Sequence, residues 1–263
     1  RVLNHAIQKS GPVHLNVPME EPLFGMTTSP IKITFNTEPK FYHPNIDFKS
    51  FKKQWKKAEK KLILVGVNNP GVIDQQWLDL IDADPSVILM TETTSNLRSS
   101  NAVNSIDSLI APLEWGNHLF FKTLKPEILL TFGGMVVSKK IKKLLRHHSP
   151  QEHWHVDPFR AYDTYYCLTQ YFSMTVNSFF SGLLNDYQAP MTNYKSSVLH
   201  QYRSQLQKVN TYLRQIPFSD LKAFEIIFSN LPYKIHLQLA NSSTVRYAQL
   251  FDMPEGAEVF SNR

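Results

Sequence analysis

The stretch KLILVGVNNPGVIDQQWLDLIDADPSVILMTE, residues 61–92, decides the fold class. It opens on a continuous apolar run, passes through a segment with apolar residues at helical spacing, and closes on a second apolar run. Apolar runs of this length are typical of strands that are buried on both faces. Two such strands joined by a helix form a βαβ unit, which predicts a parallel sheet.

The same alternation continues along the chain. The segments PEILLTFGG, SKKIKKLLRHH and EHWHVDP predict a further strand, a helix and another strand, and the segment before them is mostly helical with a break at Pro112. We therefore predict an α/β fold, with a Rossmann-like open parallel sheet and helices on both faces, over residues 46–190. Partial domains are expected on either side of it.

The flanking segments differ in composition from this central region. Residues 1–24 contain a helix end and a short strand, Val13–Asn16, between prolines, and residues 25–45 are rich in Pro, Thr and Asn and predict a linker. Residues 191–232 predict a helical connection that is interrupted near Pro217. Residues 233–263 predict a new strand and helix, which is typical of the start of another domain.

Composition limits the class of protein. The apolar content is 42% and the formal net charge is +6, which fits a globular protein that binds small anions. The longest apolar runs have strand length, so no membrane insertion is predicted. Cys167 is the only cysteine, which excludes an internal disulfide and favours a cytoplasmic protein. The lysine-rich segment 48–61 predicts an amphipathic helix with a solvated basic face, and because no nucleic-acid motif accompanies it, we expect no nucleic-acid partner.

Two polar turns at strand ends are candidate anion sites. In FGGMVVSKK, Ser138 is a predicted helix N-cap, and Lys139 and Lys140 in the first turn oppose the helix dipole unless an anion lies nearby. In LANSSTVR, Arg246 lies near a second helix start, where its guanidinium could bind a carboxylate. The alternatives, which are a solvated lysine-rich helix and an arginine packed on a neighbouring helix, are equally compatible with the sequence.

Other polar loops carry weaker signals. GVNNPG, after the first strand, lacks both the Lys-Ser/Thr of a phosphate loop and the pattern of a dinucleotide fold. His153 and His155 share one face of a predicted strand, but no cysteine lies nearby, and we predict no metal site. The loop TETTSNLR places Glu92, Ser95 and Arg98 after a strand end, with no firm role.

Taken in order, GPVHLNVPMEEPLF, TETTSNLR, FGGMVVSKK, LANSSTVR and VFSNR carry a family resemblance. The chain resembles the thiamine-diphosphate-dependent 2-succinyl-5-enolpyruvyl-6-hydroxy-3-cyclohexene-1-carboxylate synthases of menaquinone biosynthesis. The resemblance implies a three-domain parent, of which residues 1–24 end the pyrimidine-binding domain, 46–190 form the middle domain and 233–263 begin the diphosphate-binding domain. The chain is therefore expected to be a fragment.

The resemblance also implies a function. The parent would be a transferase, a homodimer or homotetramer, that decarboxylates 2-oxoglutarate and adds the succinyl unit to isochorismate. The residues matching the family's substrate-binding positions are Lys139, Lys140, Asn241, Ser242, Arg246 and Arg263. The family has an arginine where Lys140 stands, so the planar fork is missing there. The catalytic glutamate and the magnesium ligands belong to segments that this sequence lacks. We therefore expect no catalytic residue, no bound thiamine diphosphate or Mg²⁺, and no activity from the chain alone.

Two other classes of function remain open from the residues themselves. The chain could be a stand-alone Rossmann-like module that binds a nucleotide or an anionic metabolite, or a purely structural scaffold between domains. A nucleotide module should have a glycine-rich first turn, and GVNNPG fits that requirement poorly.

Overall fold

The computed structural model describes residues 2–18, 46–113 and 118–262. The chain divides into two compact units, residues 1–45 and 46–263. In the first unit, α1 (Val2–Lys9) is followed by irregular chain over residues 12–18. The strand expected at Val13–Asn16 is therefore not formed. A lone extended segment needs a neighbouring strand to satisfy its backbone groups, and the described residues provide none there.

A parallel sheet forms the centre of the second unit, as predicted, and it has five strands. The strand order is β2-β1-β3-β4-β5, and every neighbouring pair is parallel. The strands are β1 (Lys61–Val65), β2 (Val87–Met90), β3 (Ile128–Phe132), β4 (Glu152–Val156) and β5 (Gln170–Phe172). Because β3 pairs with β1 on the side opposite to β2, the order reverses between β1 and β3, and this is the topological switch point of the sheet.

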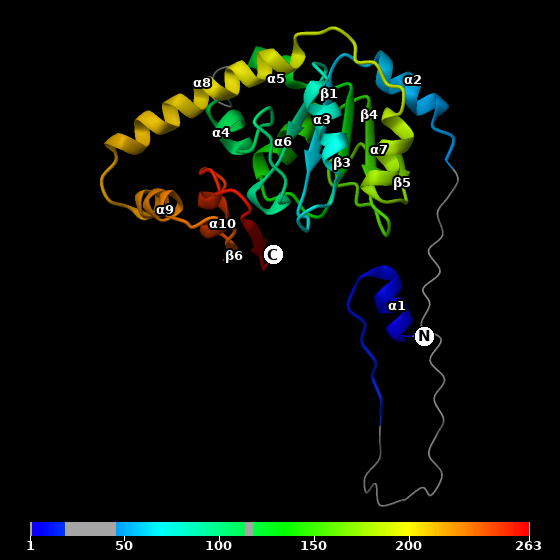
Figure 1. The fold of residues 1–263 in the computed structure, drawn as a ribbon, viewed down its shortest axis with the longest axis horizontal. Helices are drawn as coiled ribbons and strands as arrows, with labels where there is room; N and C mark the ends of the chain where they lie inside the picture. Colours follow the sequence, from blue (N-terminus) through cyan, green and yellow to red (C-terminus); the bar gives the residue numbers. More distant parts are fainter. Residues whose placement is uncertain (1, 19–45, 114–117, 263) are drawn as a thin grey trace, which may run out of the picture. The chain divides into compact units, whose positions relative to one another are not determined.

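Helices cover both faces of this sheet, as predicted (Figure 1). The helices are α2 (Lys49–Lys57), α3 (Gln75–Ala83), α4 (Ile106–Ile110), α5 (His118–Leu124), α6 (Lys139–His147), α7 (Val176–Leu184), α8 (Tyr194–Gln215) and α9 (Asp220–Ser229), with short 3₁₀ turns η1 (Thr93–Ser95) and η2 (Ala111–Leu113). The side chains of β1 alternate between two hydrophobic cores. Ile63 and Val65 join the core that includes α2, α3 and α7, whereas Leu62 and Leu64 join the core that includes α4, α5, α6 and α8.

A small second sheet follows α9. Its strands β6 (His236–Leu239) and β7 (Glu258–Ser261) are parallel and are joined through α10 (Ser243–Ala248). A third hydrophobic cluster binds this βαβ unit to the rest of the fold. It contains Phe228 of α9, Val245 of α10, Val259 of β7 and Val137 from the loop before α6. The sequence predicted β6 and α10 but not β7.

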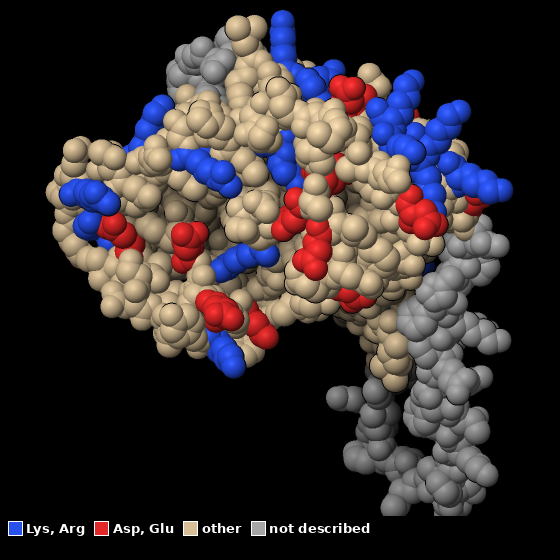
Figure 2. Space-filling view, turned by 45° about the horizontal axis from the view of Figure 1, so that its top comes forward, with Lys and Arg blue, Asp and Glu red and all other residues tan. Residues whose placement is uncertain are grey.

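The lysine-rich segment behaves as predicted from its pattern. On α2, Trp55 is buried, whereas Lys49, Lys53 and Lys56 are exposed. Figure 2 shows the gathering of basic side chains on this part of the surface. Among the described residues, no helix combines the length and apolarity that crossing a bilayer would need.

Candidate functional site

The first candidate turn lies between β3 and α6. Ser138 caps α6, as predicted, because its hydroxyl oxygen accepts a hydrogen bond from the Ile141 N–H at 3.1 Å. The Ser138 hydroxyl donates in turn to the Asp107 carboxylate. A cap that is itself fixed by a carboxylate gives the start of α6 one defined position.

A buried carboxylate, Glu92, occupies the backbone donors in front of this helix. Its two oxygens accept from the N–H groups of Val137 at 2.6 Å and Ser138 at 2.7 Å. Burial raises the pKa of Glu92 to about 7, and the two N–H donors act against this rise because they favour the charged form. Glu92 follows the end of β2 by two residues, and its hydrogen bonds connect this segment to the start of α6.

The Glu92 carboxylate lies at the start of α6, next to the turn that carries Lys139 and Lys140. Lys139 is exposed and Lys140 is partly exposed in the first turn of α6, where cations are unfavourable next to the helix dipole. Asp107, and Glu92 in its ionised form, supply negative charge at this end of the helix from inside the protein. The dipole argument therefore requires no external anion, and the case for Lys139 and Lys140 as ligand-binding residues depends on their exposure and their neighbours.

The second candidate turn lies between β6 and α10. Ser242 has a positive φ of 68°, in a region that side-chain-bearing residues rarely adopt, and its N–H donates to the Asn241 side-chain oxygen at 2.7 Å. Arg246 is exposed, and within the described residues it forms no ion pair. An arginine packed on a neighbouring helix, which was the alternative interpretation, would be covered and is not what the structure contains.

One buried side chain connects the two turns. Val137 immediately precedes the N-cap of α6 and belongs to the same buried cluster as Val245, the neighbour of Arg246. The backbone before Lys139 and the backbone before Arg246 are thus packed into one cluster. The structure brings the two turns to the same region, although they are about a hundred residues apart in sequence.

The loop after β2 is the joint between the large sheet and the small one. The side chain of Asn96, whose φ is 48°, donates to the Val259 carbonyl at 2.9 Å and accepts from the Val259 N–H at 2.7 Å. It therefore pairs with β7 as a neighbouring peptide would. Ser95 donates to the Val65 carbonyl at 2.8 Å and accepts from the Glu92 N–H at 2.9 Å. The only sequence signal for this role was an asparagine, the side-chain type most tolerant of positive φ after glycine.

Arg98, the third residue that the sequence left without a role, lies beside the same joint. It lines a cavity of about 180 Å³ together with Glu92, Asn104 and Asp252. Arg98 is exposed, and Asp252 lies in the loop that follows α10. The cavity therefore opens between the loop after β2 and the C-terminal βαβ unit.

The two strand histidines bind the same threonine. The Thr131 hydroxyl lies 2.9 Å from His153 Nε2 and 2.8 Å from His155 Nδ1. Burial lowers the pKa of both imidazoles, for His153 to about 4, so both are neutral at pH 7. Among the described residues, no cluster of three or more His, Cys, Asp or Glu side chains could hold a metal ion. Arg263, the last predicted substrate contact, lies outside the described residues.

Fold and site together define a Rossmann-like α/β domain with a second βαβ unit docked at the loops that follow its strands. The chain is 45% identical over 262 residues to the 2-succinyl-5-enolpyruvyl-6-hydroxy-3-cyclohexene-1-carboxylate synthase of Flavobacterium psychrophilum, which covers 98% of this chain and 46% of that protein. The proteins of the same name from Flavobacterium johnsoniae and Christiangramia forsetii are 41% and 40% identical, covering 100% and 99% of this chain and 48% and 46% of their own lengths. The resemblance predicted from the motifs is thereby confirmed.

The chain spans about half the length of the curated relatives it matches. No protein-family model matches it. The chain therefore belongs to this synthase family. The activity and substrates of a whole synthase are proposals for this chain.

Proposed function

We propose that this chain forms the central part of a thiamine-diphosphate-dependent carboligase, which decarboxylates 2-oxoglutarate and adds the succinyl unit to isochorismate in menaquinone biosynthesis. Its similarity to synthases from three organisms over nearly its whole length supports this proposal. The structural observation that supports the proposal is the packing of Val137 with Val245, which brings the start of α6 and the start of α10 into one buried cluster.

In this proposal the chain contributes carboxylate binding. Both substrates are carboxylates, and exposed cations at the two turns provide charge-assisted hydrogen bonds to them. Lys139 and Lys140 approach from α6, and Arg246 approaches from α10, with Asn241 and Ser242 beside it. Arg263 would add a further contact. The strained backbone at Ser242 supports a functional turn, because strain of this kind is concentrated at binding sites.

The described residues do not supply a metal site for the cofactor. Thiamine diphosphate supplies the carbanion chemistry that decarboxylation of a 2-oxo acid requires, and its diphosphate is held through a magnesium ion with oxygen ligands. Over residues 2–18, 46–113 and 118–262, no cluster of acidic and imidazole side chains is arranged to hold a metal. We therefore assign no magnesium ligand to these residues and no step of the reaction to the cofactor within this chain.

The nucleotide-module alternative is less well supported. The N–H groups in front of α6, which a phosphate would need, donate to Glu92. The turn after β1 is closed internally, since the Gly66 N–H donates to the Phe132 carbonyl at 2.9 Å. The donors in front of α6 are therefore occupied by a carboxylate of the protein itself.

Kinetics of the full-length protein that carries this chain test the proposal. Carbon dioxide release from 2-oxoglutarate should depend on isochorismate, thiamine diphosphate and Mg²⁺. Arg246→Gln should raise the KM of a carboxylate substrate by about 10-fold or more, because a charge-assisted hydrogen bond contributes about 1.5–3 kcal/mol. Arg203→Gln, at an exposed arginine of α8, removes the same charge elsewhere and should leave KM unchanged.

Two results would contradict the proposal. Absence of carbon dioxide release with both substrates and the cofactor present would remove the reaction itself. Equal KM values for the Arg246→Gln and Arg203→Gln variants would leave the reaction standing but would remove Arg246 from substrate binding.

A further inference from the structure

The outer side of α2 and the turn after it carry a concentrated positive charge. Residues 47–60 contain six lysines and two acidic residues, which is a net charge of +4 against +6 for the whole chain. These lysines form a basic patch, with four members exposed and two partly exposed: Lys49, Lys53, Lys56 and Lys57, and then Lys52 and Lys60. A surface patch of this charge attracts anions over a distance that the ionic strength sets.

The spacing of the lysines turns them to one side of the helix. Because successive residues of a helix are about 100° apart, the five lysines from Lys49 to Lys57 fall within an arc of about 140° and span about 12 Å along the axis. Phe51 and Trp55 lie on the opposite arc and pack against Trp154, with ring centroids 5.4 and 5.9 Å apart. The aromatic side holds α2 on the sheet, and the basic patch is presented outward as one surface.

The lysines of the basic patch have no acidic partner among the described residues, where none of them forms an ion pair. The Lys52 ammonium donates to the Asn185 carbonyl at 3.0 Å, which fixes this lysine at the end of α7. The Asp47 carboxylate accepts from the Lys49 N–H at 3.0 Å and so lies at the start of the helix. The charge of the basic patch is therefore available to an external anionic partner.

The residue types favour a lipid surface over a nucleic acid. Residues 47–60 contain no arginine, which is the side chain suited to bidentate contacts with phosphates and base edges. The aromatic rings of α2 are packed against the core, so they do not form a platform for bases. Clusters of roughly four to eight basic residues on an amphipathic helix are typical of binding to anionic lipid headgroups.

The basic patch fits adsorption to a bilayer rather than insertion into it. A helix that inserts at the interface needs an exposed apolar face. The apolar face of α2 belongs to the protein core, and the exposed residues between the lysines, Ser50 and Gln54, are polar. The attraction is therefore electrostatic, and salt should screen it.

Adsorption through α2 leaves the lysine turn of the candidate site free. α2 packs in the core that includes α3 and α7, on one face of the sheet, whereas α6 packs in the core on the other face. Lys139 begins α6. It therefore lies across the sheet from the basic patch.

We propose that α2 is a docking surface for a bilayer that contains anionic phospholipid, with the lysines of the basic patch against the headgroups. The complementary charge of the two surfaces is the reason for this choice of partner. The inference goes beyond the proposed carboligase function and does not depend on it.

Flotation of the full-length protein with lipid vesicles tests this surface. We expect binding to vesicles of phosphatidylglycerol mixed with phosphatidylcholine, and none to vesicles of phosphatidylcholine alone. The triple variant Lys53→Gln, Lys56→Gln and Lys57→Gln should bind about 100-fold more weakly, because each lysine near an anionic leaflet contributes about a factor of five. High salt should release the parent, because it shortens the screening length.

A second triple variant is the matched control. Arg203→Gln, Lys208→Gln and Arg214→Gln remove the same charge from exposed positions of α8, which packs on the other face of the sheet. This control should bind as the parent does. Changing the three patch lysines to arginine keeps the charge and should also preserve binding. Circular dichroism establishes that each variant is folded before flotation.

Three results would overturn the proposal. The first is absence of binding by the parent to the anionic vesicles. The second is an equal loss of binding in the lysine-to-glutamine variant and the α8 control, which would show attraction by the charge of the whole protein. The third is binding to duplex DNA that is tighter than binding to the vesicles and is lost in the lysine-to-glutamine variant, which would assign the basic patch to a nucleic acid.

Discussion

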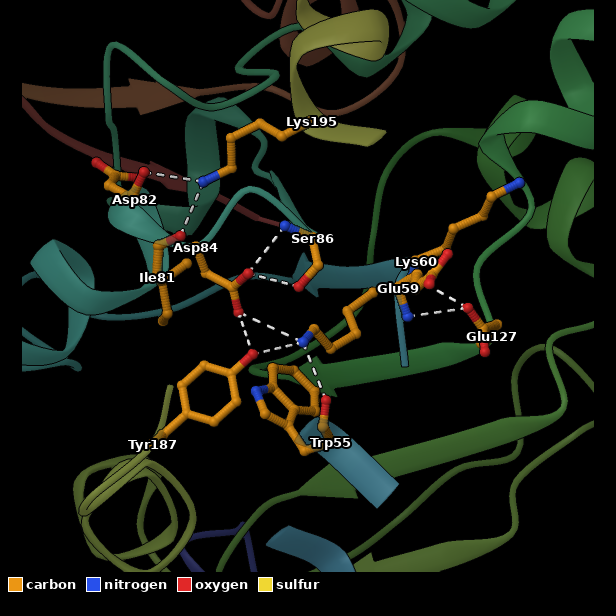
Figure 3. A network of polar contacts seen from close by, with 11 residues as sticks. Trp55, Glu59, Lys60, Ile81, Asp82, Asp84, Ser86, Glu127, Tyr187 and Lys195 are labelled. Atoms are coloured by element: carbon orange, nitrogen blue, oxygen red, sulfur yellow. Dashed lines mark hydrogen bonds and ion pairs between the residues drawn. The ribbon is translucent and has the colours of Figure 1, made fainter. Parts of the chain in front are cut away.

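Lys61 allows a quantitative test of the electrostatics at the amino edge of the sheet. Its side chain is fully buried, and its ammonium donates to the Tyr187 hydroxyl at 2.6 Å and to the Trp55 carbonyl at 3.0 Å. The Asp84 carboxylate lies 3.4 Å away and accepts from the Tyr187 hydroxyl at 2.6 Å. Figure 3 shows Asp84, Tyr187 and Trp55 gathered around this ammonium. We predict that Lys61→Met changes how stability depends on pH.

The magnitude follows from the pKa of Lys61. Burial lowers it from 10.5 to about 8, and Asp84 opposes this change. Between these two pH values the unfolded chain binds more protons than the folded one, so the free energy of unfolding rises with pH. At 1.36 kcal/mol for each pKa unit, Lys61 should add about 2.5 kcal/mol of stability between pH 7 and pH 10. Lys61→Met has no such proton and should lack this increment.

Urea unfolding at pH 7 and pH 10, followed by circular dichroism, measures the difference. The other titrating groups are common to the parent and Lys61→Met, and they cancel when the two pH trends are subtracted. Asp84→Asn leaves the ammonium buried without its carboxylate and should cost about 3–5 kcal/mol at pH 7. The double variant should cost less than the sum of the single variants, because no unpaired charge remains. Identical pH trends in the parent and Lys61→Met would refute the reasoning, since Lys61 would then have an ordinary pKa.

Three further substitutions test the joint and the switch point. Glu92→Gln should lower the free energy of unfolding by about 2 kcal/mol, because one of two buried N–H groups loses its acceptor. It should also abolish a pH trend: because the pKa of Glu92 is raised to about 7, the parent protein loses stability as the pH rises from 4.5 through 7. Thermal melts of the parent and the variant at pH 5 and pH 8 measure this trend. Asn96→Ala removes both contacts to Val259 and should speed hydrogen exchange of the Val259 amide by about 10-fold, while an unchanged rate would show that β7 is held elsewhere. Gly66→Ala forces a Cβ against the Gly134 carbonyl and should lower the free energy of unfolding in urea by about 3 kcal/mol or more. The control Gly71→Ala, which has open space around its Cβ, should lower it by about 1 kcal/mol. Equal losses for the two variants would contradict the clash.

The sheet could be predicted because its strands are buried on both faces. A strand such as β1 is apolar at nearly every position, and that pattern has few other meanings between helical segments. β5 and β7 were missed for the opposite reason. β5 is a three-residue strand at the edge of the sheet, and β7 has only Val259 fully buried, so neither carries a recognisable pattern. Their strand conformation depends on a neighbour that is distant in sequence.

The candidate site could be predicted only in part, and for a similar reason. Ser138 as a cap is a local property, and sequence reasoning found it. The partner of that turn is Glu92, which lies about 45 residues earlier and reaches it only because β2 and β3 flank the same strand. A cation at a helix start indicates that negative charge lies nearby, but the sequence alone cannot tell an internal carboxylate from a ligand.

The loop from Glu92 to Asn96 therefore has one structural role that accounts for three of its polar residues. Glu92 fixes the start of α6, Ser95 fixes the loop to the end of β1 through the Val65 carbonyl, and Asn96 fixes β7. Because α6 and the βαβ unit of α10 are both anchored to these few residues, a shift of the loop would move the lysine turn and the arginine turn together. If the two turns bind one carboxylate substrate between them, this loop determines their spacing without contacting the substrate. The polar residues of the loop would then serve to position the lysine turn and the arginine turn, in the way that residues behind a binding site orient the groups that contact a ligand.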